Sequence, residues 1–175
     1  MNNLQGERTR ISVKMKKNTA QNTQMEFTLK AVGYIRRKDQ ETFINFLPEY
    51  KPALKELETF SHVQILWWFS EFGDENSRKT TCFDKMPFEA PPLGVFSCRS
   101  PMRPNPIGLT TAKIIAVDQD KGRVQIADMD AFDGTPVLDL KAYMPSCDRV
   151  KEPKVPEWME DWPEWMPEKG LGLEG

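Results

Sequence analysis

The chain has 175 residues, of which 39% are hydrophobic and 29% charged, and its formal net charge at pH 7 is −2. This length suits one domain with a real core, and no apolar run reaches the length of a membrane span or of a signal-peptide core. Three widely spaced cysteines and a single histidine argue against a disulfide framework or a zinc site. We therefore expect a cytoplasmic protein with reduced thiols and with no membrane or metal partner.

The charge is unevenly distributed along the chain. Residues 1–24 carry five basic side chains and one acidic side chain, a net charge of +4, so the remaining residues carry −6. We interpret residues 1–24 as a polar basic tail, which either solubilises the protein or supplies phosphate contacts to RNA. The folded domain is expected over residues 25–150, followed by a Pro/Trp-rich tail over residues 151–175.

Alternating apolar residues predict a succession of short strands. These strands are expected over residues 27–35, 42–47, 61–69, 94–98, 109–117, 123–129 and 136–143. A short helix is expected over residues 52–60, a long loop over residues 70–92, and a hairpin turn at the Asp-Lys-Gly sequence of residues 120–122.

The order of these elements indicates the fold class. The strand at residues 61–69 becomes apolar on both faces toward its end, as in a closed barrel or under a covering subunit. No strand-helix-strand periodicity and no glycine-rich turn support a doubly wound nucleotide-binding fold. The sequence therefore predicts a mostly β protein, a small barrel of six or seven strands with short helices and an irregular C-terminal tail.

The sequence RSPMRPNPIGLT at residues 99–110 contains three prolines, two arginines and an asparagine. Each proline fixes its own φ and removes a backbone donor, and each restricts the residue before it to extended geometry. The segment is therefore expected to be a rigid, irregular loop that presents two permanent cations and one amide. Such a loop suits a ligand better than it suits a core.

A second polar segment, DMDAFDGTPVLDLKAY at residues 128–143, gathers Asp128, Asp130, Asp133 and Asp139 around Gly134. These aspartates are either turn-forming residues or part of a binding site. No serine lies in a nucleophile elbow, and His62 is better explained as a hydrogen-bonded core residue than as a catalytic base. The two segments together supply cations, amides and carboxylates without an obvious nucleophile.

Three tryptophans, Trp158, Trp162 and Trp165, are spaced by four and three residues in the C-terminal tail. Large aromatic side chains are unfavourable on an open surface, so the tail is expected to dock against the barrel or a second subunit. Stacking on a substrate is the alternative.

Three stretches, GVFSCRSPMRPNPIGLT, FSHVQILWWFS and DGTPVLDLKAYMPSCD, resemble the YaeB/TrmO (TsaA-like) family over residues 26–150. This resemblance implies a small β-barrel methyltransferase that uses S-adenosyl-L-methionine and acts as a homodimer. It implies methylation of the exocyclic amine of threonylcarbamoyl-adenosine in the anticodon loop of tRNA. Ser70 stands where better-known bacterial members have a histidine.

The resemblance also places candidate site residues on this chain. The residues that match the family's cofactor contacts are Ser70, Glu71, Arg99, Leu109, Asp130, Ala131, Phe132 and Asp133. The residues predicted to contact the substrate or line the pocket are Arg103, Asn105, Lys141 and Tyr143. A sulfonium needs carboxylates or aromatic faces, such as Asp130, Asp133, Trp68 and Phe69, and a carboxylate ligand needs a guanidinium, from Arg99 or Arg103. Asp133 is predicted to accept the proton of the methylated amine.

Three functions stay open on the sequence. The first is methylation of a modified adenosine in tRNA by a homodimer. The second is the same chemistry on a small metabolite, which the acidic body of the chain favours. The third is a sensor that binds S-adenosyl-L-methionine without turnover.

Overall fold

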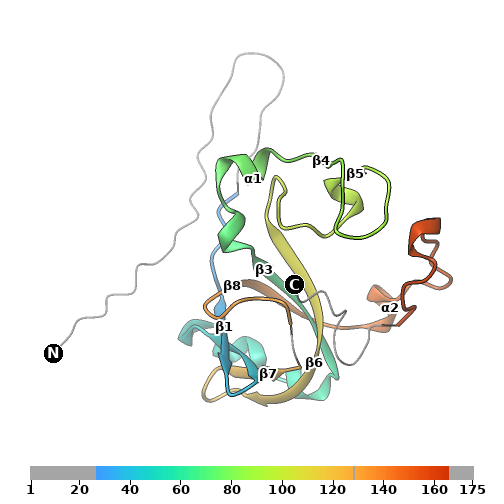
Figure 1. Ribbon diagram of the computed structural model, residues 1–175. Coiled ribbons are helices and arrows are strands. Elements are labelled where there is room, and N and C mark those ends of the chain that lie inside the picture. Colours follow the sequence, from blue (N-terminus) through green and yellow to red (C-terminus); the bar gives the residue numbers. More distant parts are fainter. Residues whose placement is uncertain (1–26, 128, 166–175) are drawn as a thin grey trace.

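The computed structural model describes residues 27–127 and 129–165, and these form a closed six-stranded β-barrel with short attached helices (Figure 1). The barrel strands are β1 Gly33–Lys38, β2 Glu41–Phe46, β3 His62–Trp68, β6 Ile107–Asp118, β7 Arg123–Ile126 and β8 Pro136–Ala142. They follow the order β1-β2-β7-β6-β3-β8, and every neighbouring pair is antiparallel. The predicted fold class is confirmed.

Shorter elements decorate the barrel. The α-helices are α1 Glu75–Lys79 and α2 Pro145–Asp148. The 3-10 turns are η1 Pro48–Leu54, η2 Leu57–Thr59, η3 Ser70–Phe72, η4 Val95–Ser97 and η5 Glu157–Met159. Strands β4 Cys82–Phe83 and β5 Leu93–Gly94 pair with each other and lie, with α1, beyond one end of the barrel (Figure 1).

The barrel interior is filled by alternate residues of the strands, as the pleat of a strand requires. In β3 the buried residues are Val63, Ile65 and Trp67, and the intervening side chains are only half-buried. Ile35 of β1 and Ile44 of β2 are fully buried and belong to the same core. The strand predicted to be buried on both faces therefore has one interior face and one partly covered face.

Gly108 of β6 is required by the packing of Trp67, its partner across the β3–β6 pair. A Cβ atom at Gly108 would lie 2.3 Å from the Trp67 ring, which is far inside van der Waals contact. The absence of a side chain at Gly108 thus lets the indole lie flat against β6.

Several predicted boundaries are wrong for identifiable reasons. The strand predicted at residues 27–35 begins only at Gly33, and Phe27 remains 68% exposed. The helix predicted at residues 52–60 is instead the two 3-10 turns η1 and η2, although they do bury Leu54 and Leu57. Pro48 and Pro52 lie within η1 and remove backbone donors there, which disfavours a regular α-helix.

The strand predicted at residues 94–98 is mostly the 3-10 turn η4. Its backbone carbonyls at Val95 and Cys98 accept hydrogen bonds from the Arg103 side chain instead of from a neighbouring strand. The predicted turn at residues 120–122 is confirmed, because Gly122 has a φ of +67° and the flanking strands β6 and β7 pair.

The tail docks on its own chain through aromatic rings. Trp158 stacks on Phe88 at 5.7 Å between ring centroids, and Trp162 meets the Phe88 ring edge-on at 5.3 Å. Phe88 belongs to the segment between β4 and β5, so the tail covers that segment rather than the barrel wall. Trp165 stays 62% exposed beneath the Arg149 guanidinium, which lies 4.7 Å from its ring centroid.

Some expectations fall outside this structure. The basic segment 1–24 and Asp128 lie outside the described residues. Among the residues that are described, no helix is long and apolar enough to cross a membrane. The three cysteines are free thiols, as predicted.

Candidate functional site

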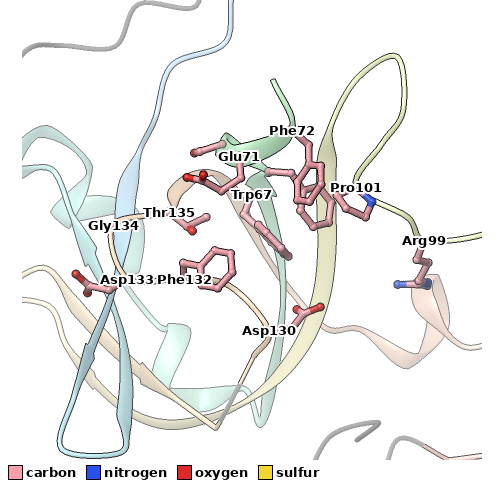
Figure 2. Close-up of a pocket in the computed structure, with 12 residues that line it drawn as sticks. Trp67, Glu71, Phe72, Arg99, Pro101, Asp130, Phe132, Asp133, Gly134 and Thr135 are labelled. Atoms are coloured by element: carbon pink, nitrogen blue, oxygen red, sulfur yellow. The ribbon is translucent and has the colours of Figure 1, made fainter. Parts of the chain in front are cut away.

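A pocket of about 360 Å³ opens at the end of the barrel where β3 ends and β8 begins (Figure 2). Three parts of the chain form it: the end of β3 with η3, the proline loop (residues 98–106) and the aspartate loop (residues 129–135). Six predicted site residues line it, namely Ser70, Glu71, Arg99, Asp130, Phe132 and Asp133. Its volume lies in the range of small-molecule sites.

Aromatic rings form the floor of the pocket. Trp67 packs against Phe69 with 4.2 Å between ring centroids, and Phe72 meets Phe69 edge-on at 6.5 Å. The indole nitrogen of Trp67 donates to the Thr110 hydroxyl at 3.1 Å, which satisfies its only donor and fixes the ring. Phe132 reaches toward this floor from the opposite side and is 70% exposed (Figure 2).

The proline loop is held together by Arg103. Its guanidinium donates to the backbone carbonyls of Ser100 at 2.8 Å and of Val95 and Cys98 at 2.6 Å each. Arg103 was predicted to bind a ligand carboxylate or substrate, and the structure does not bring it into the pocket. Its Nε and Nη2 donors are engaged by backbone carbonyls, so Arg103 shapes the loop.

Arg99 has the opposite arrangement. Among the residues that the structure describes it makes one hydrogen bond, from Nη1 to the Leu109 carbonyl at 3.1 Å, and it lines the pocket with its remaining donors open. A guanidinium with free donors is suited to a carboxylate. Asn105, predicted as a pocket residue, is exposed and lies outside the lining.

The aspartate loop is joined to β1. Gly134, with a φ of +82°, donates its amide to the Ile35 carbonyl at 2.9 Å, and the Ile35 amide donates to Thr135 at 2.9 Å. The Asp133 carboxylate accepts from the Arg37 amide at 2.9 Å and lies 3.6 Å from the Arg36 guanidinium.

Asp133 therefore faces β1 and points away from the aromatic floor (Figure 2). The role of Asp133 as the proton acceptor stays a prediction, and the contacts with β1 show that its carboxylate also holds the aspartate loop.

Two other carboxylates are open. Glu71 and Asp130 line the pocket and make no hydrogen bond or ion pair with any of the described residues. They flank the rings of Trp67 and Phe132 (Figure 2). Free carboxylates beside aromatic faces form an environment that attracts an organic cation.

The remaining predicted residues lie away from the lining. The Leu109 carbonyl accepts the hydrogen bond from Arg99, but the Leu109 side chain is not part of the lining. The Ala131 side chain is buried in the core with 2% exposure. Lys141 is six residues beyond Thr135 along β8, about 20 Å at strand spacing. It pairs with Asp139 at 2.7 Å, and this hydrogen bond raises the pKa of Lys141.

Tyr143 follows β8 at its far end and packs edge-on against His62 at 6.4 Å. The structure therefore does not bring Lys141 or Tyr143 to this pocket. His62 itself shares a hydrogen bond with the Ser61 hydroxyl at 2.9 Å, at the opposite end of β3 from the pocket. The hydrogen bond agrees with the interpretation of His62 as a hydrogen-bonded residue, but His62 lies on the half-buried face of β3 and not in the core.

Sequence reasoning missed part of the lining. It named Trp68 as an aromatic face, whereas Trp67 is the ring in the pocket. The sequence does indicate Trp67, because alternate residues of a strand share a face and Trp67 follows the interior residues Val63 and Ile65 at this spacing. Residues without such a signal are Phe72, Pro101, Gly134 and Thr135.

No group of three or more His, Cys, Asp or Glu side chains that could hold a metal ion occurs within residues 27–127 and 129–165. The protein is a small β-barrel, and its pocket combines groups that suit an organic cation that also carries an anionic group. Aromatic rings and free carboxylates serve the first part of such a ligand, and Arg99 serves the second.

Comparison with known proteins gives the family. The family model described as the tRNA-methyltransferase O N-terminal domain matches residues 33–149. The chain therefore belongs to the TrmO family, as its motifs predicted.

A probable S-adenosyl-L-methionine-binding protein of Archaeoglobus fulgidus is 35% identical over 119 residues, which are 67% of this chain and 30% of that protein. A tRNA (adenine(37)-N6)-methyltransferase of Mus musculus is 44% identical over 101 residues, 58% of this chain and 22% of the mouse protein. The crystal structure of TrmO from Pseudomonas aeruginosa has a TM-score of 0.58 at 28% identity, covering 74% of this chain and 61% of that one. The chain thus spans less than a third of the length of the two curated relatives.

Proposed function

We propose that this chain binds S-adenosyl-L-methionine in the pocket and transfers its methyl group to the exocyclic amine of an adenosine in tRNA. The observation that carries the proposal is the pairing of the open carboxylates Glu71 and Asp130 with the rings of Trp67 and Phe132, opposite the free donors of Arg99. The names of the archaeal and mouse relatives agree with this ligand and acceptor.

The residues fit the parts of the proposed cofactor. When bound, S-adenosyl-L-methionine supplies a methyl group on a positively charged sulfur, and its transfer to an amine releases one proton. Glu71 and Asp130 balance the positive charge, and the aromatic floor excludes water around it. Arg99 holds the carboxylate end, and the rigid proline loop keeps Arg99 in place, so that little freedom is lost on binding.

The released proton needs an acceptor in the pocket. Glu71 and Asp130 are the carboxylates without a partner among the described residues, so we assign this role to them rather than to Asp133. Much of the rate enhancement of such a displacement comes from holding the reactants in line. Asp130→Asn and Glu71→Gln should each lower kcat, whereas Asp133→Asn should mainly weaken cofactor binding.

We further propose that the active form is a homodimer and that it works in the cytoplasm, where its tRNA substrate is found. Exposed large apolar side chains support association, because Phe96 is 89% exposed and Leu109 44% exposed. Light scattering on the purified protein tests this, and a monomer at working concentration would contradict it.

A small-metabolite acceptor is the second candidate, and the charge of the chain favours it. Residues 25–175 carry a net charge of −6, which does not attract a polyanion. The basic residues of the segment 1–24 would then have no RNA partner.

The decisive experiment uses the purified protein with methyl-labelled S-adenosyl-L-methionine and a host extract divided into tRNA and small-metabolite fractions. The tRNA comes from a strain that lacks this gene, so that its target sites are unmodified. Label in an adenosine nucleoside after digestion would support the tRNA proposal, and Asp130→Asn should abolish most of it. Label only among metabolites would move the assignment to a small-molecule enzyme. Cofactor binding without label in either fraction would favour the sensor.

A further inference from the structure

Arg37, a residue of β1 that no sequence motif singled out, is bonded to the aspartate loop at three points. Its backbone amide donates to Oδ1 of Asp133 at 2.9 Å, and its side-chain Nε donates to the Ala131 carbonyl at 2.8 Å. Its Nη2 donates to the Met129 carbonyl. These partners lie between 92 and 96 residues further along the chain, so the contacts join distant segments.

The spacing of the two carbonyls explains why an arginine stands here. Met129 and Ala131 are two residues apart, and the Arg37 side chain reaches the carbonyls of both. The planar guanidinium presents several donors in a fixed fork and can serve both carbonyls at once. A lysine has a single ammonium at the end of a flexible stem and does not reproduce this geometry.

Successive side chains of residues 129–132 go in turn to the core and to the pocket. The side chains of Met129 and Ala131 are buried in the barrel core, with 4% and 2% exposure. Asp130 and Phe132, the residues between and after them, line the pocket. The core holds one set of side chains, and Arg37 holds the carbonyls of the same residues, so the loop is fixed on two sides.

We propose that Arg37 is a positioning residue, which sets Asp130 and Phe132 at the pocket by binding the backbone of the aspartate loop. Arg37 is not part of the pocket lining, so it acts through the loop rather than by touching a ligand. The part of this proposal that concerns cofactor affinity rests on the proposed function. The part that concerns loop order does not depend on the proposed function, because it can be tested on the protein without a ligand.

The first test therefore uses the free protein. Amide hydrogen exchange is measured for wild type, Arg37→Lys and a matched control, Arg123→Lys. Arg123 is an exposed barrel arginine that donates to the Asn45 side chain at 3.0 Å, outside the pocket. We expect faster exchange at Gly134 and Thr135 in Arg37→Lys only, with the amides of β3 unchanged. Unchanged exchange at Gly134 and Thr135 would overturn the positioning role.

The second test measures the affinity for S-adenosyl-L-methionine by calorimetry and separates KM from kcat. Arg37→Lys should weaken cofactor binding about 10-fold, as expected for the loss of one charge-assisted hydrogen bond. At saturating cofactor kcat should stay within about 2-fold of wild type, because the ligand then orders the loop. A fall in kcat with unchanged affinity would contradict the proposal. If wild type itself binds no cofactor, the proposed function fails while the exchange result still decides the role of Arg37.

Discussion

The two loops that border the pocket are both fixed by an arginine that donates to backbone carbonyls, but the arginines come from very different places in the chain. Arg103 belongs to the proline loop and reaches carbonyls three, five and eight residues back. Arg37 belongs to β1 and reaches carbonyls 92 and 94 residues ahead. The proline loop is thus shaped by its own sequence, whereas the aspartate loop takes its shape only in the closed barrel.

This difference has a physical consequence. Prolines and a local clamp restrict the proline loop before the barrel forms, so part of its ordering is already present in the unfolded chain. The aspartate loop has a glycine at its turn and depends on contacts whose formation requires chain closure over about 90 residues. We expect the aspartate loop to be the first part of the pocket to lose order.

The largest effect should come from removing the floor that both loops share. In Gly108→Ala the new Cβ collides with Trp67, whose ring cannot move without disturbing Phe69. We expect destabilisation of about 1–3 kcal/mol and loss of cofactor binding, measured by thermal unfolding and calorimetry. Gly94→Ala is the matched control, since a Cβ there meets nothing closer than 3.8 Å and stability should not change.

Arg103→Ala should disrupt the proline loop alone. It leaves three partly buried carbonyls without their donor, so we expect cofactor affinity to fall about 10- to 100-fold. Arg78→Ala removes one exposed bond to the Pro104 carbonyl and should lower the affinity by about 3-fold or less. Hydrogen exchange in the aspartate loop should stay as in wild type. Loosening of both loops together would show that they are one unit.

Arg99→Ala separates ligand contact from loop shape. Arg99 is exposed and makes one hydrogen bond to the Leu109 carbonyl, so thermal stability should not change. Loss of a charge-assisted contact should weaken S-adenosyl-L-methionine binding about 10-fold. Binding of adenosine alone, which lacks the carboxylate, should be unaffected. Equal losses for both ligands would mean that Arg99 supports the loop instead.

The smallest effect concerns pH and reaches only the proline loop. Hydrogen bonds from the Ser77 hydroxyl and amide hold the pKa of the Asp74 carboxyl below its usual value, at the start of α1. This stabilisation is present above the unfolded pKa of about 3.9 and is lost as the pH falls through the lower folded pKa. Because Arg78 of α1 bonds to Pro104, the proline loop should loosen with α1.

The measurement compares the melting temperatures of wild type and Asp74→Asn from neutral pH down to a pH below the folded pKa of Asp74. Asparagine keeps an acceptor but not the charge, so wild type should be slightly more stable near neutral pH. The difference should vanish in acid, below the folded pKa of Asp74. A difference that grows toward low pH would contradict this sign.

Some of the site could be predicted from the sequence because its signals are local. The prolines at residues 101, 104 and 106 exclude regular structure, and the predicted rigid loop is present. The family motifs placed Arg99, Asp130 and Glu71, and all three line one pocket. The alternation of β3 also predicts which tryptophan faces the interior: Trp67 lies on the same face as Val63 and Ile65, and Trp68 lies on the other face.

Other placements depend on which strands become neighbours. Lys141 and Tyr143 share a motif with the aspartate loop, but β8 carries them to the far end of the barrel. Arg103 looked like a ligand contact because a charged side chain in a loop is usually free, and only the fold shows its donors engaged by carbonyls.

Local features of the chain account for the period of the strands, the rigidity of the proline loop and the family of the domain. These features depend on the dihedral preferences of single residues and on motifs that are contiguous in the chain. The tertiary structure decided that Arg37 fixes the aspartate loop, that Asp133 faces β1, and that Glu71 and Asp130 stay open in the pocket. The reason is that the closure of the barrel brings together residues separated by more than 90 positions, and no local preference specifies which of them will meet.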